Sequence, residues 1–376
     1  MKKQIKIGII GLGRIGKVHA QGYAKLVDCI PDVPVVPEIY ALLRTRLHAD
    51  QDFVKSIGSP LVTRDPQEFF RQPLDAVDIC TPNYLHREQA LRAIAQGMHV
   101  YCEKPLANNL QEAREMAAAA RQSGVLNHTA FSFRYLPAVK LIKQALKAKL
   151  IGSITHFHIR YYHSSYLNPQ KPMSWRLKLD QSGGGALADL GIHTIDLVHY
   201  LIGQPLWVQA EARTYVHKRT SAGRLTGKDK VDVDDWGIIL LGFENDTRGY
   251  IETSRVAAGK ERGFELSIFG KKGGLFMDLS QPYKAHHFNF FKDKWQDLTE
   301  LAPSSQKEQQ MAKIFACGLP FGEDLHMACI LDFLYSLYLG KQSDVGFAVA
   351  VAAQEVLEAA YRSSQHDGAR IPLPLK

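Results

Sequence analysis

The sequence has few cysteines and no long hydrophobic run, and both shortages narrow the kind of protein that it encodes. Of its 376 residues only five are cysteines, scattered along the chain without a C-x-x-C pair, so we expect neither a disulfide framework nor a cysteine zinc site. No apolar stretch approaches the roughly 20 residues that span a bilayer. The first residues also lack the apolar segment and cleavage site of a signal peptide. We therefore expect a cytoplasmic protein without a membrane partner.

Dense clusters of charge are missing too. The net charge is +8, but the lysines and arginines are spread out, and the densest basic stretch, from His217 to Lys230, contains no aromatic residue for base stacking. We interpret this stretch as a solvated loop and expect no nucleic acid partner. The sequence shows no internal repeat. With 45% hydrophobic and 22% charged residues, the composition is that of a folded globular chain, and the length suits two domains.

The first third of the chain alternates short apolar runs with helical patterns. The runs that predict strands cover residues 5–10, 39–43, 61–62, 76–80, 99–102 and 125–131. Helical patterns lie at 17–26, 88–95 and 110–121, and glycines end the last two. Continuous apolar strands that alternate with helices indicate parallel pairing with both faces buried. We predict an α/β fold whose first domain, residues 1–133, is a six-strand, doubly wound parallel sheet of the Rossmann type.

After about residue 134 the pattern changes to period-two alternation with few intervening helices. The expected strands cover residues 155–161, 208–215, 236–243, 248–255, 264–269 and 275–278, after a helix at 137–150. This predicts an α+β domain over residues 134–376 with a large, mostly antiparallel open sheet, covered by helices on one face. A late helix, about 347–361, is expected to pack back on the first domain. Ile239, Leu241 and Phe243 are interpreted as lying on the open face, which suits a subunit partner.

A G-x-G-x-x-G motif stands between the first strand and the first helix. Its first glycine permits the tight turn, its second lets the backbone approach a pyrophosphate, and its third lets helix and strand pack closely. The helix N-terminus adds amide donors and a positive dipole. The predicted contacts of a dinucleotide here are Gly11, Gly13, Arg14, Ile15 and Gly16.

The end of the second strand predicts which dinucleotide binds. An Asp or Glu at this place would bind the ribose hydroxyls of NAD(H), but the chain has Arg44, Thr45 and Arg46. A guanidinium can bind a 2′-phosphate through two hydrogen bonds. We expect NADP(H) or NAD(H) as cofactor, with a preference for NADP(H). The other interpretation is that these arginines face solvent.

Two further motifs carry groups for acid–base chemistry. An E-K-P motif at residues 103–105 follows the fifth strand, and a run of glycines leads into a helix that places Asp189 and His193 one turn apart. Oxidation of a secondary alcohol requires a base for the hydroxyl proton, which His193 can take near neutral pH. Lys104 can donate to the same oxygen, and Asp189 can orient the imidazole or bind a neighbouring hydroxyl. Asp189 and His193 are also metal-ligand types, but no third ligand lies near them in the sequence, so we expect no metal.

These motifs, together with Thr81-Pro82-Asn83 and Trp175-Arg176, make the chain resemble the Gfo/Idh/MocA family from Lys6 to about Tyr361. The resemblance implies an NAD(P)-dependent dehydrogenase that transfers a hydride between the nicotinamide and a secondary hydroxyl or ketone of a sugar, cyclitol or glycoside. It implies the same Lys, Asp and His as catalytic residues, a cis peptide bond before Pro105, and a homodimer or homotetramer formed through the open sheet.

The remaining site predictions concern cofactor and substrate contacts. Beyond the glycine motif and the second strand, the expected cofactor contacts are Thr81, Pro82, Asn83, His86, Glu103 and Lys104. The expected substrate contacts are Lys104, Arg134, Tyr135, Trp175, Arg176, Asp189 and His193, with His163 and His326 as weaker candidates and Asp196 as a structural residue. Two alternatives stay open, namely a glycoside hydrolase or lyase that retains its cofactor and oxidises the sugar transiently, and a non-catalytic cofactor sensor.

Overall fold

The computed structural model describes residues 2–47, 49–221, 227–260, 263–298 and 305–375. It divides into two compact units. The first contains the described parts of residues 1–107, 111–132 and 302–351, and the second those of 108–110, 133–301 and 352–376. The prediction placed the boundary at residue 133 and therefore residues 302–351 in the second domain. In the structure the described part of this segment belongs to the first unit. No helix among the described residues is long and apolar enough to cross a membrane.

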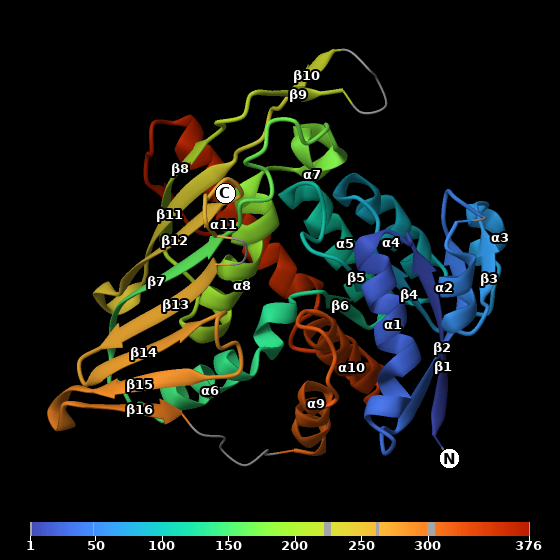
Figure 1. Ribbon diagram of the computed structural model, residues 1–376, viewed down its shortest axis with the longest axis horizontal. Coiled ribbons are helices and arrows are strands. Elements are labelled where there is room, and N and C mark those ends of the chain that lie inside the picture. The colour runs from blue at the N-terminus through green and yellow to red at the C-terminus, as the bar shows by residue number, and fades with distance from the viewer. Residues whose placement is uncertain (1, 48, 222–226, 261–262, 299–304, 376) are drawn as a thin grey trace. The chain divides into compact units, whose positions relative to one another are not determined.

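The first unit is built on a six-stranded parallel sheet, as the sequence predicts (Figure 1). Its strands are β1 (Lys3–Ile10), β2 (Val35–Leu43), β3 (Leu61–Thr63), β4 (Ala76–Ile79), β5 (His99–Cys102) and β6 (Asn127–Thr129). Their order is β3-β2-β1-β4-β5-β6, and every adjacent pair is parallel. The order reverses between β1 and β4, so the loops after these two strands border the crevice in which such sheets bind ligands.

Helices connect and cover these strands. They are α1 (Arg14–Cys29), α2 (Gln51–Ser56), α3 (Pro66–Phe70), α4 (His86–Ala95), α5 (Leu110–Ser123), α9 (Gln306–Ala316) and α10 (Glu323–Leu339). Helix α10 explains why the late segment belongs to the first unit. A Cβ on Gly22 of α1 would lie 3.0 Å from Ile330 Cδ1 of α10, so the glycine permits close packing of the two helices. Almost all of α10 is buried.

Two local predictions for the first unit were wrong. The second strand, predicted over residues 39–43, already begins at Val35, so Pro37 lies within β2 opposite Ile5. Strand β3 pairs only with Ala41–Leu43, so at Pro37 the strand has one neighbour and the missing N–H is tolerated. A disulfide joins Cys29 at the end of α1 to Cys317, with an S–S distance of 2.13 Å. The two cysteines are 288 residues apart, and only the packing of α1, α9 and α10 brings them together. Cys80, Cys102 and Cys329 are free and buried.

The second unit contains a nine-stranded, mostly antiparallel sheet, as predicted. Its strands are β7 (Ile154–Tyr162), β8 (Trp207–Arg213), β11 (Trp236–Gly242), β12 (Arg248–Ser254), β13 (Gly263–Gly270), β14 (Gly273–Asp278), β15 (Ala285–Asn289), β16 (Lys294–Leu298) and β17 (Ile371–Pro372). The order is β16-β15-β14-β13-β7-β12-β11-β8-β17, and the one parallel pair among these described strands is β7 with β12. The predictions did not include β15, β16 or β17.

Helices cover one face of this sheet. Helices α6 (Pro137–Lys147) and α8 (Ile192–Leu201) lie on the same side in Figure 1. Ile239 and Leu241 of β11 are 0% and 1% exposed, whereas Leu240 between them is 43% exposed. The expectation that Ile239, Leu241 and Phe243 lie on the open face was therefore wrong, because these three side chains are buried in the core.

Two further segments complete the second unit. Helix α11 (Phe347–Gln365) begins in the first unit, where the Phe347 N–H donates to Asn127 Oδ1, and most of its length belongs to the second. The basic stretch forms a two-stranded ribbon of β9 (Lys218–Thr220) and β10 (Lys228–Lys230). Arg219 in this ribbon is fully buried, so the interpretation of the stretch as a solvated loop was wrong for that residue.

Candidate functional site

The G-x-G-x-x-G motif forms the turn between β1 and α1. Gly11 has a φ of +92°, which side chains other than glycine rarely adopt, and a Cβ on Gly16 would lie only 2.0 Å from the Gly11 carbonyl oxygen. Gly13 is the N-cap of α1, and a Cβ there would meet nothing within 4 Å. Two of the glycines are thus required by the fold itself, and the third leaves open space at a helix N-terminus. This arrangement fits the pyrophosphate of a dinucleotide.

The end of β2 carries the residues predicted to read the ribose. Arg44 is buried, with its Nη2 3.6 Å from Asp50 Oδ2, and its Nε and Nη1 atoms have no acceptor among the described residues. Asp50 also forms an ion pair of 2.9 Å with Lys17 of α1. Thr45 and Arg46 are exposed. The strand end therefore offers both cationic groups and one carboxylate to a ribose and its substituents.

The loops after β4 and β5 hold one another through His86. This side chain is fully buried, with Nε2 2.9 Å from the carbonyl oxygen of Thr81 and Nδ1 3.1 Å from that of Pro105. Burial lowers the pKa of His86, so the ring is neutral and only one nitrogen donates at a time. His86 thus joins the two loops, and its cofactor contact stays a prediction. Asn83 is buried in the same region, and Thr81 Oγ1 donates to Gln89 Oε1.

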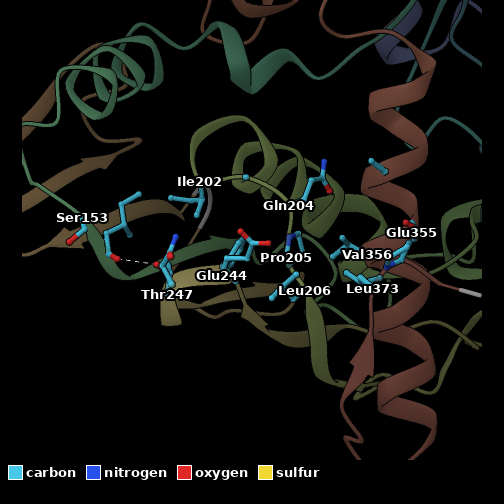
Figure 2. A pocket seen from close by; sticks show the side chains of 16 residues that line it. Ser153, Ile202, Gln204, Pro205, Leu206, Glu244, Thr247, Glu355, Val356 and Leu373 are labelled. Atoms are coloured by element: carbon cyan, nitrogen blue, oxygen red, sulfur yellow. Dashed lines mark hydrogen bonds between the residues drawn. The ribbon is translucent and has the colours of Figure 1, made fainter.

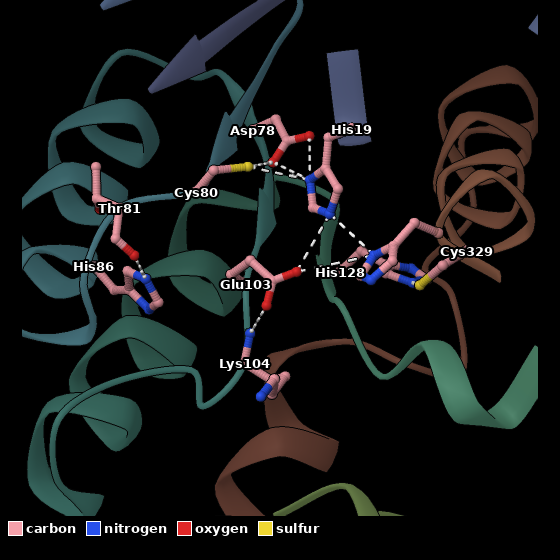
Figure 3. A network of polar contacts seen from close by, with 10 residues as sticks. His19, Asp78, Cys80, Thr81, His86, Glu103, Lys104, His128 and Cys329 are labelled. Carbon is pink, nitrogen blue, oxygen red and sulfur yellow. Dashed lines mark hydrogen bonds and ion pairs between the residues drawn. The ribbon is translucent and has the colours of Figure 1, made fainter. Parts of the chain in front are cut away.

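A buried polar network lies beneath the E-K-P motif, and Figure 3 shows it. His19 of α1 has its Nδ1 3.0 Å from Asp78 Oδ2 and 3.1 Å from Cys80 Sγ. Its Nε2 lies 3.2 Å from Glu103 Oε1 and 3.1 Å from Nδ1 of His326 on α10. The network thus links α1, β4, the loop after β5, and α10.

The electrostatics of this network favour a charged His19 and a charged Glu103. Burial alone lowers the pKa of His19, but Cys80 and Asp78 raise it well above its usual value. Burial raises the pKa of Glu103, but His19 and further positive neighbours bring it down to about 2. Burial and the charge of His19 lower the pKa of His326 to about 3. A charged imidazole held between two carboxylates satisfies groups that would be costly to bury unpaired.

Lys104 is attached directly to this network. Its backbone N–H donates to Glu103 Oε2 at 3.1 Å, and the Lys104–Pro105 peptide bond is cis, as the family resemblance implies. Sequence reasoning placed Glu103 among the cofactor contacts and did not foresee the role of His19 or Asp78. A polar residue within the apolar run 76–80, and a histidine three residues after Gly16, were the signals that could have indicated it.

Two sets of three side chains in this network lie close enough together to hold a metal ion. They are His19, Asp78 and Cys80, and His19, Glu103 and His326. His19 belongs to both sets, and hydrogen bonds and ion pairs within the network already engage it on both ring nitrogens. We therefore describe the cluster as a hydrogen-bonded network that supports the E-K-P loop.

Asp189 and His193 lie in the second unit, where a π-helical turn (Leu187–Gly191) leads into α8. The sequence predicted a regular α-helix at this point. His193 is 7% exposed, and its ring stacks on that of Phe133 with centroids 4.8 Å apart. Asp189 is half-buried. The stacking fixes the plane of the imidazole, which a proton acceptor requires.

Two predicted substrate contacts, Arg134 and Tyr135, are buried. Arg134 is buried and donates to both carboxylate oxygens of Asp196, at 2.7 and 2.6 Å, with its guanidinium 5.0 Å from the ring centroid of Tyr200. Asp196 is therefore a structural residue, in agreement with the prediction. Tyr135 is 3% exposed. Burial leaves Arg134 and Tyr135 little surface for a substrate.

Other predicted substrate contacts are accessible. Trp175 and Arg176 lie in a short 3₁₀ turn, where the guanidinium of Arg176 is 4.2 Å from the Trp175 ring. Trp175 is half-buried and Arg176 exposed. Burial lowers the pKa of His163, Asp189 counteracts this, and Arg255 and Lys171 lower it further. The negative charge of Asp189 therefore acts on the imidazole of His163.

A pocket of about 760 Å³ in the second unit lies away from these residues. Gln204, Pro205, Leu206, Glu244 and Glu355 are among its lining side chains (Figure 2). None of the predicted site residues lines it, so we assign it no part in the chemistry considered above.

Comparison with known proteins supports the family that these motifs indicate. A model of an oxidoreductase family with an NAD-binding Rossmann fold matches residues 5–131, and a model of the GFO/IDH/MocA C-terminal domain matches residues 139–276. Levoglucosan dehydrogenase of Pseudarthrobacter phenanthrenivorans is 31% identical over 291 residues, which cover 74% of this chain and 75% of that protein. The chain belongs to the Gfo/Idh/MocA family.

A further relative and a solved structure agree with this membership. Glucose-6-phosphate 3-dehydrogenase of Bacillus subtilis is 29% identical over 74% of this chain and 75% of that protein. A structure of levoglucosan dehydrogenase in complex with NADH and levoglucosan matches 99% of this chain and 100% of that one, with a TM-score of 0.90 and 26% identity. This member of the Gfo/Idh/MocA family is an NAD-binding oxidoreductase.

Proposed function

We propose that the protein oxidises a secondary hydroxyl of a sugar or cyclitol, or reduces the corresponding ketone, with a nicotinamide dinucleotide. The observation that carries the proposal is the presence of Lys104, Asp189 and His193 in a chain of this family, with His193 buried and stacked on Phe133. The names of the relatives, which include levoglucosan dehydrogenase and glucose-6-phosphate 3-dehydrogenase, support sugars as the substrate class.

Each of the three side chains has a role that its chemistry allows. The nicotinamide, when bound, supplies the hydride acceptor. His193 takes the proton of the substrate hydroxyl, since an imidazole exchanges protons near neutral pH. Lys104 donates a hydrogen bond to the same oxygen and stabilises the negative charge that develops there. Asp189 orients the imidazole or binds a neighbouring hydroxyl.

The substitution His193→Ala tests this proposal. We expect turnover, followed by nicotinamide absorbance across a panel of aldoses, cyclitols and glycosides, to fall by about 10²–10⁴, the range for loss of a general base. The Kd for the cofactor should stay within about twofold, because the cradle lies in the other unit. His366→Ala, which changes an exposed histidine of the tail, is the control. Unchanged turnover in His193→Ala contradicts the assignment, and cofactor binding without any turnover favours transient oxidation or sensing.

We further propose that the end of β2 favours NADP(H). Arg46 is exposed beside Thr45, and Arg44 keeps two nitrogens without an acceptor among the described residues, which suits a 2′-phosphate. In Arg46→Ala the Kd for NADPH should rise about tenfold, the scale of one lost charge-assisted contact, and that for NADH should not change. Arg121→Ala, at an exposed arginine of α5, is the control. Equal effects of Arg46→Ala on both dinucleotides contradict this preference.

We also propose that a second copy of the chain covers the open face of the nine-stranded sheet. Leu240 is 43% exposed on this face, and Trp295, 58% exposed, contacts the ring of Phe276 with centroids 5.0 Å apart. Apolar side chains gathered on one face are typical of a subunit interface. Size-exclusion chromatography with light scattering should show a dimer or tetramer that Leu240→Glu dissociates. A monomeric wild-type protein contradicts the proposal.

A further inference from the structure

Three cationic side chains of the second unit surround the ring of Tyr166. Lys171 Nζ lies 3.7 Å from the ring centroid, the Arg255 guanidinium carbon 4.6 Å, and the Arg219 guanidinium carbon 5.7 Å. A tyrosine ring attracts cations through its electron-rich face but carries no net charge. Three positive charges therefore lie against a ring that has no negative charge to neutralise them.

Two of these cations are fully buried without a carboxylate partner. Arg219 and Arg255 are 0% exposed, and neither forms an ion pair with any residue that the structure describes. Arg219 Nη1 donates to the carbonyl of Asn168 at 2.7 Å, and Arg255 Nη2 to that of Asp234 at 3.0 Å. The Nε atoms of both arginines have no acceptor in the described part of the chain. Carbonyl dipoles hold the guanidinium groups in place but are not ion-pair partners, and a guanidinium buried without such a partner is costly in a protein interior.

The two buried aspartates that lie between these arginines in the sequence accept hydrogen bonds from backbone N–H groups. Asp234 accepts from the backbone N–H groups of Gly185 and Leu187. Asp235 Oδ2 accepts from the backbone N–H of Tyr215 and of the residue after it. Both carboxylates thus stabilise turns, although the charge of Asp235 still acts on Arg219.

The third cation beside Tyr166, Lys171, is a side chain that solvent can reach. Lys171 is half-buried, and its Nζ donates to the carbonyl of Ser165 at 2.9 Å. Burial lowers the pKa of Lys171, and the positive charges of Arg219, Arg255 and Arg176 lower it further, while Asp189 acts in the opposite direction. Three cations and one anion therefore set the potential at this ammonium group.

This region adjoins the candidate catalytic residues of the second unit. His163 stands 5.9 Å from the Tyr166 ring, centroid to centroid, and the charges of Asp189, Arg255 and Lys171 all act on it. The excess of positive charge is thus built next to the aspartate to which we assign a role in substrate binding. A bound anion would supply the missing negative charge.

We propose that the substrate carries an anionic group, a phosphate or a carboxylate, which Lys171 binds directly and which the buried Arg219 and Arg255 attract through their fixed charge. This inference rests on the proposed function, because it specifies the substrate class of that same site. A sugar phosphate and a sugar acid share the required chemistry, and the experiment distinguishes them.

The test compares sugars that share one ring and differ in charge. Glucose, glucose 6-phosphate and glucuronate, and a matched set from any other sugar found active, are assayed as hydride donors with wild-type protein, Lys171→Gln and Lys147→Gln. Lys147 is an exposed lysine of α6 and serves as the control. We expect at least one anionic sugar to have a KM about tenfold or more below that of the neutral one. Lys171→Gln should abolish this difference with little change in kcat, and Lys147→Gln should preserve it.

Calorimetric titration with inorganic phosphate separates failure of this inference from failure of the proposed function. With the dinucleotide cradle saturated by NADPH, phosphate should bind the wild-type protein and the control but not Lys171→Gln. If no sugar is oxidised and phosphate still binds through Lys171, the anion site stands and the proposed activity is wrong. If neutral sugars are oxidised as efficiently as charged ones, or phosphate binds all three proteins alike or none, the anion site is wrong.

Discussion

The glycine motif allows the dinucleotide cradle to be tested apart from the stability of the fold. Gly13 has φ −76° and ψ −164°, a conformation open to any residue, and a Cβ there meets no atom within 4 Å. Gly13→Ala should therefore change the free energy of unfolding by no more than about 1 kcal/mol, the scale of an altered N-cap. If the pyrophosphate lies against this backbone, the added methyl group occupies its place.

The expected consequence is a selective loss of cofactor affinity. We predict that Gly13→Ala raises the Kd for NADH or NADPH at least about tenfold, or ~1.4 kcal/mol, while the melting temperature changes little. Calorimetric titration and thermal unfolding measure the two quantities on the same preparation. An unaltered Kd in a normally folded variant would show that the pyrophosphate lies elsewhere.

Gly16→Ala provides the contrast. Its Cβ would lie 2.0 Å from the carbonyl oxygen of Gly11, a distance that forces the backbone to move. This variant should lose stability as well as affinity, whereas Gly13→Ala should lose affinity alone. Equal melting temperatures for Gly16→Ala and wild type would contradict the geometry of the turn.

Three further predictions concern stability. Asp196→Ala leaves the buried Arg134 without its ion-pair partner and should lower the free energy of unfolding by about 3–5 kcal/mol, measured by denaturant titration; a loss below about 1 kcal/mol would contradict the burial of the pair. Reduction of the Cys29–Cys317 disulfide, or Cys317→Ser, should cost about 2–5 kcal/mol, and a melting temperature insensitive to reductant would show that the bond does not form. Burial and the charge of Arg134 lower the pKa of His199 to about 4, so the unfolded state binds a proton more readily. Stability should fall as pH drops from about 6.5 to 4, by up to about 1.4 kcal/mol per pH unit from this group, and His199→Gln should reduce that slope.

Local sequence patterns were sufficient for the parallel sheet and the loops after its strands. Strand β5 coincides with the apolar run 99–102, and the glycine motif lies at the expected turn. Side chains buried on both faces leave few polar positions, so most of these strands are visible as apolar runs. The E-K-P motif follows one of these runs directly, which is why its place could be predicted as well.

Edge strands and long-range contacts could not be predicted in this way. Strand β16 reads KWQDL, and four of its five residues are exposed, so it has no apolar alternation to reveal it. The disulfide joins cysteines 288 residues apart, and the network of His19 assembles side chains from four separate segments. Such contacts depend on how elements pack, and no local pattern encodes them. The π-helical turn before α8 was missed because a helical pattern in the sequence does not show whether the backbone hydrogen bonds span four residues or five.

The ion-pair partners of the buried arginines move the expected substrate contact from Arg134 to Lys171. The sequence favoured Arg134 as a substrate contact, but its guanidinium donates two hydrogen bonds to the carboxylate of Asp196. A cation neutralised by such an ion pair has little attraction left for a ligand. Arg219 and Arg255 are buried as deeply without a carboxylate partner in the described part of the chain. A buried cation that folding leaves without an ion-pair partner can find one in a bound anion. We therefore expect specificity for the substrate's anionic group to depend on the ammonium group of Lys171, beside these two arginines, and not on Arg134.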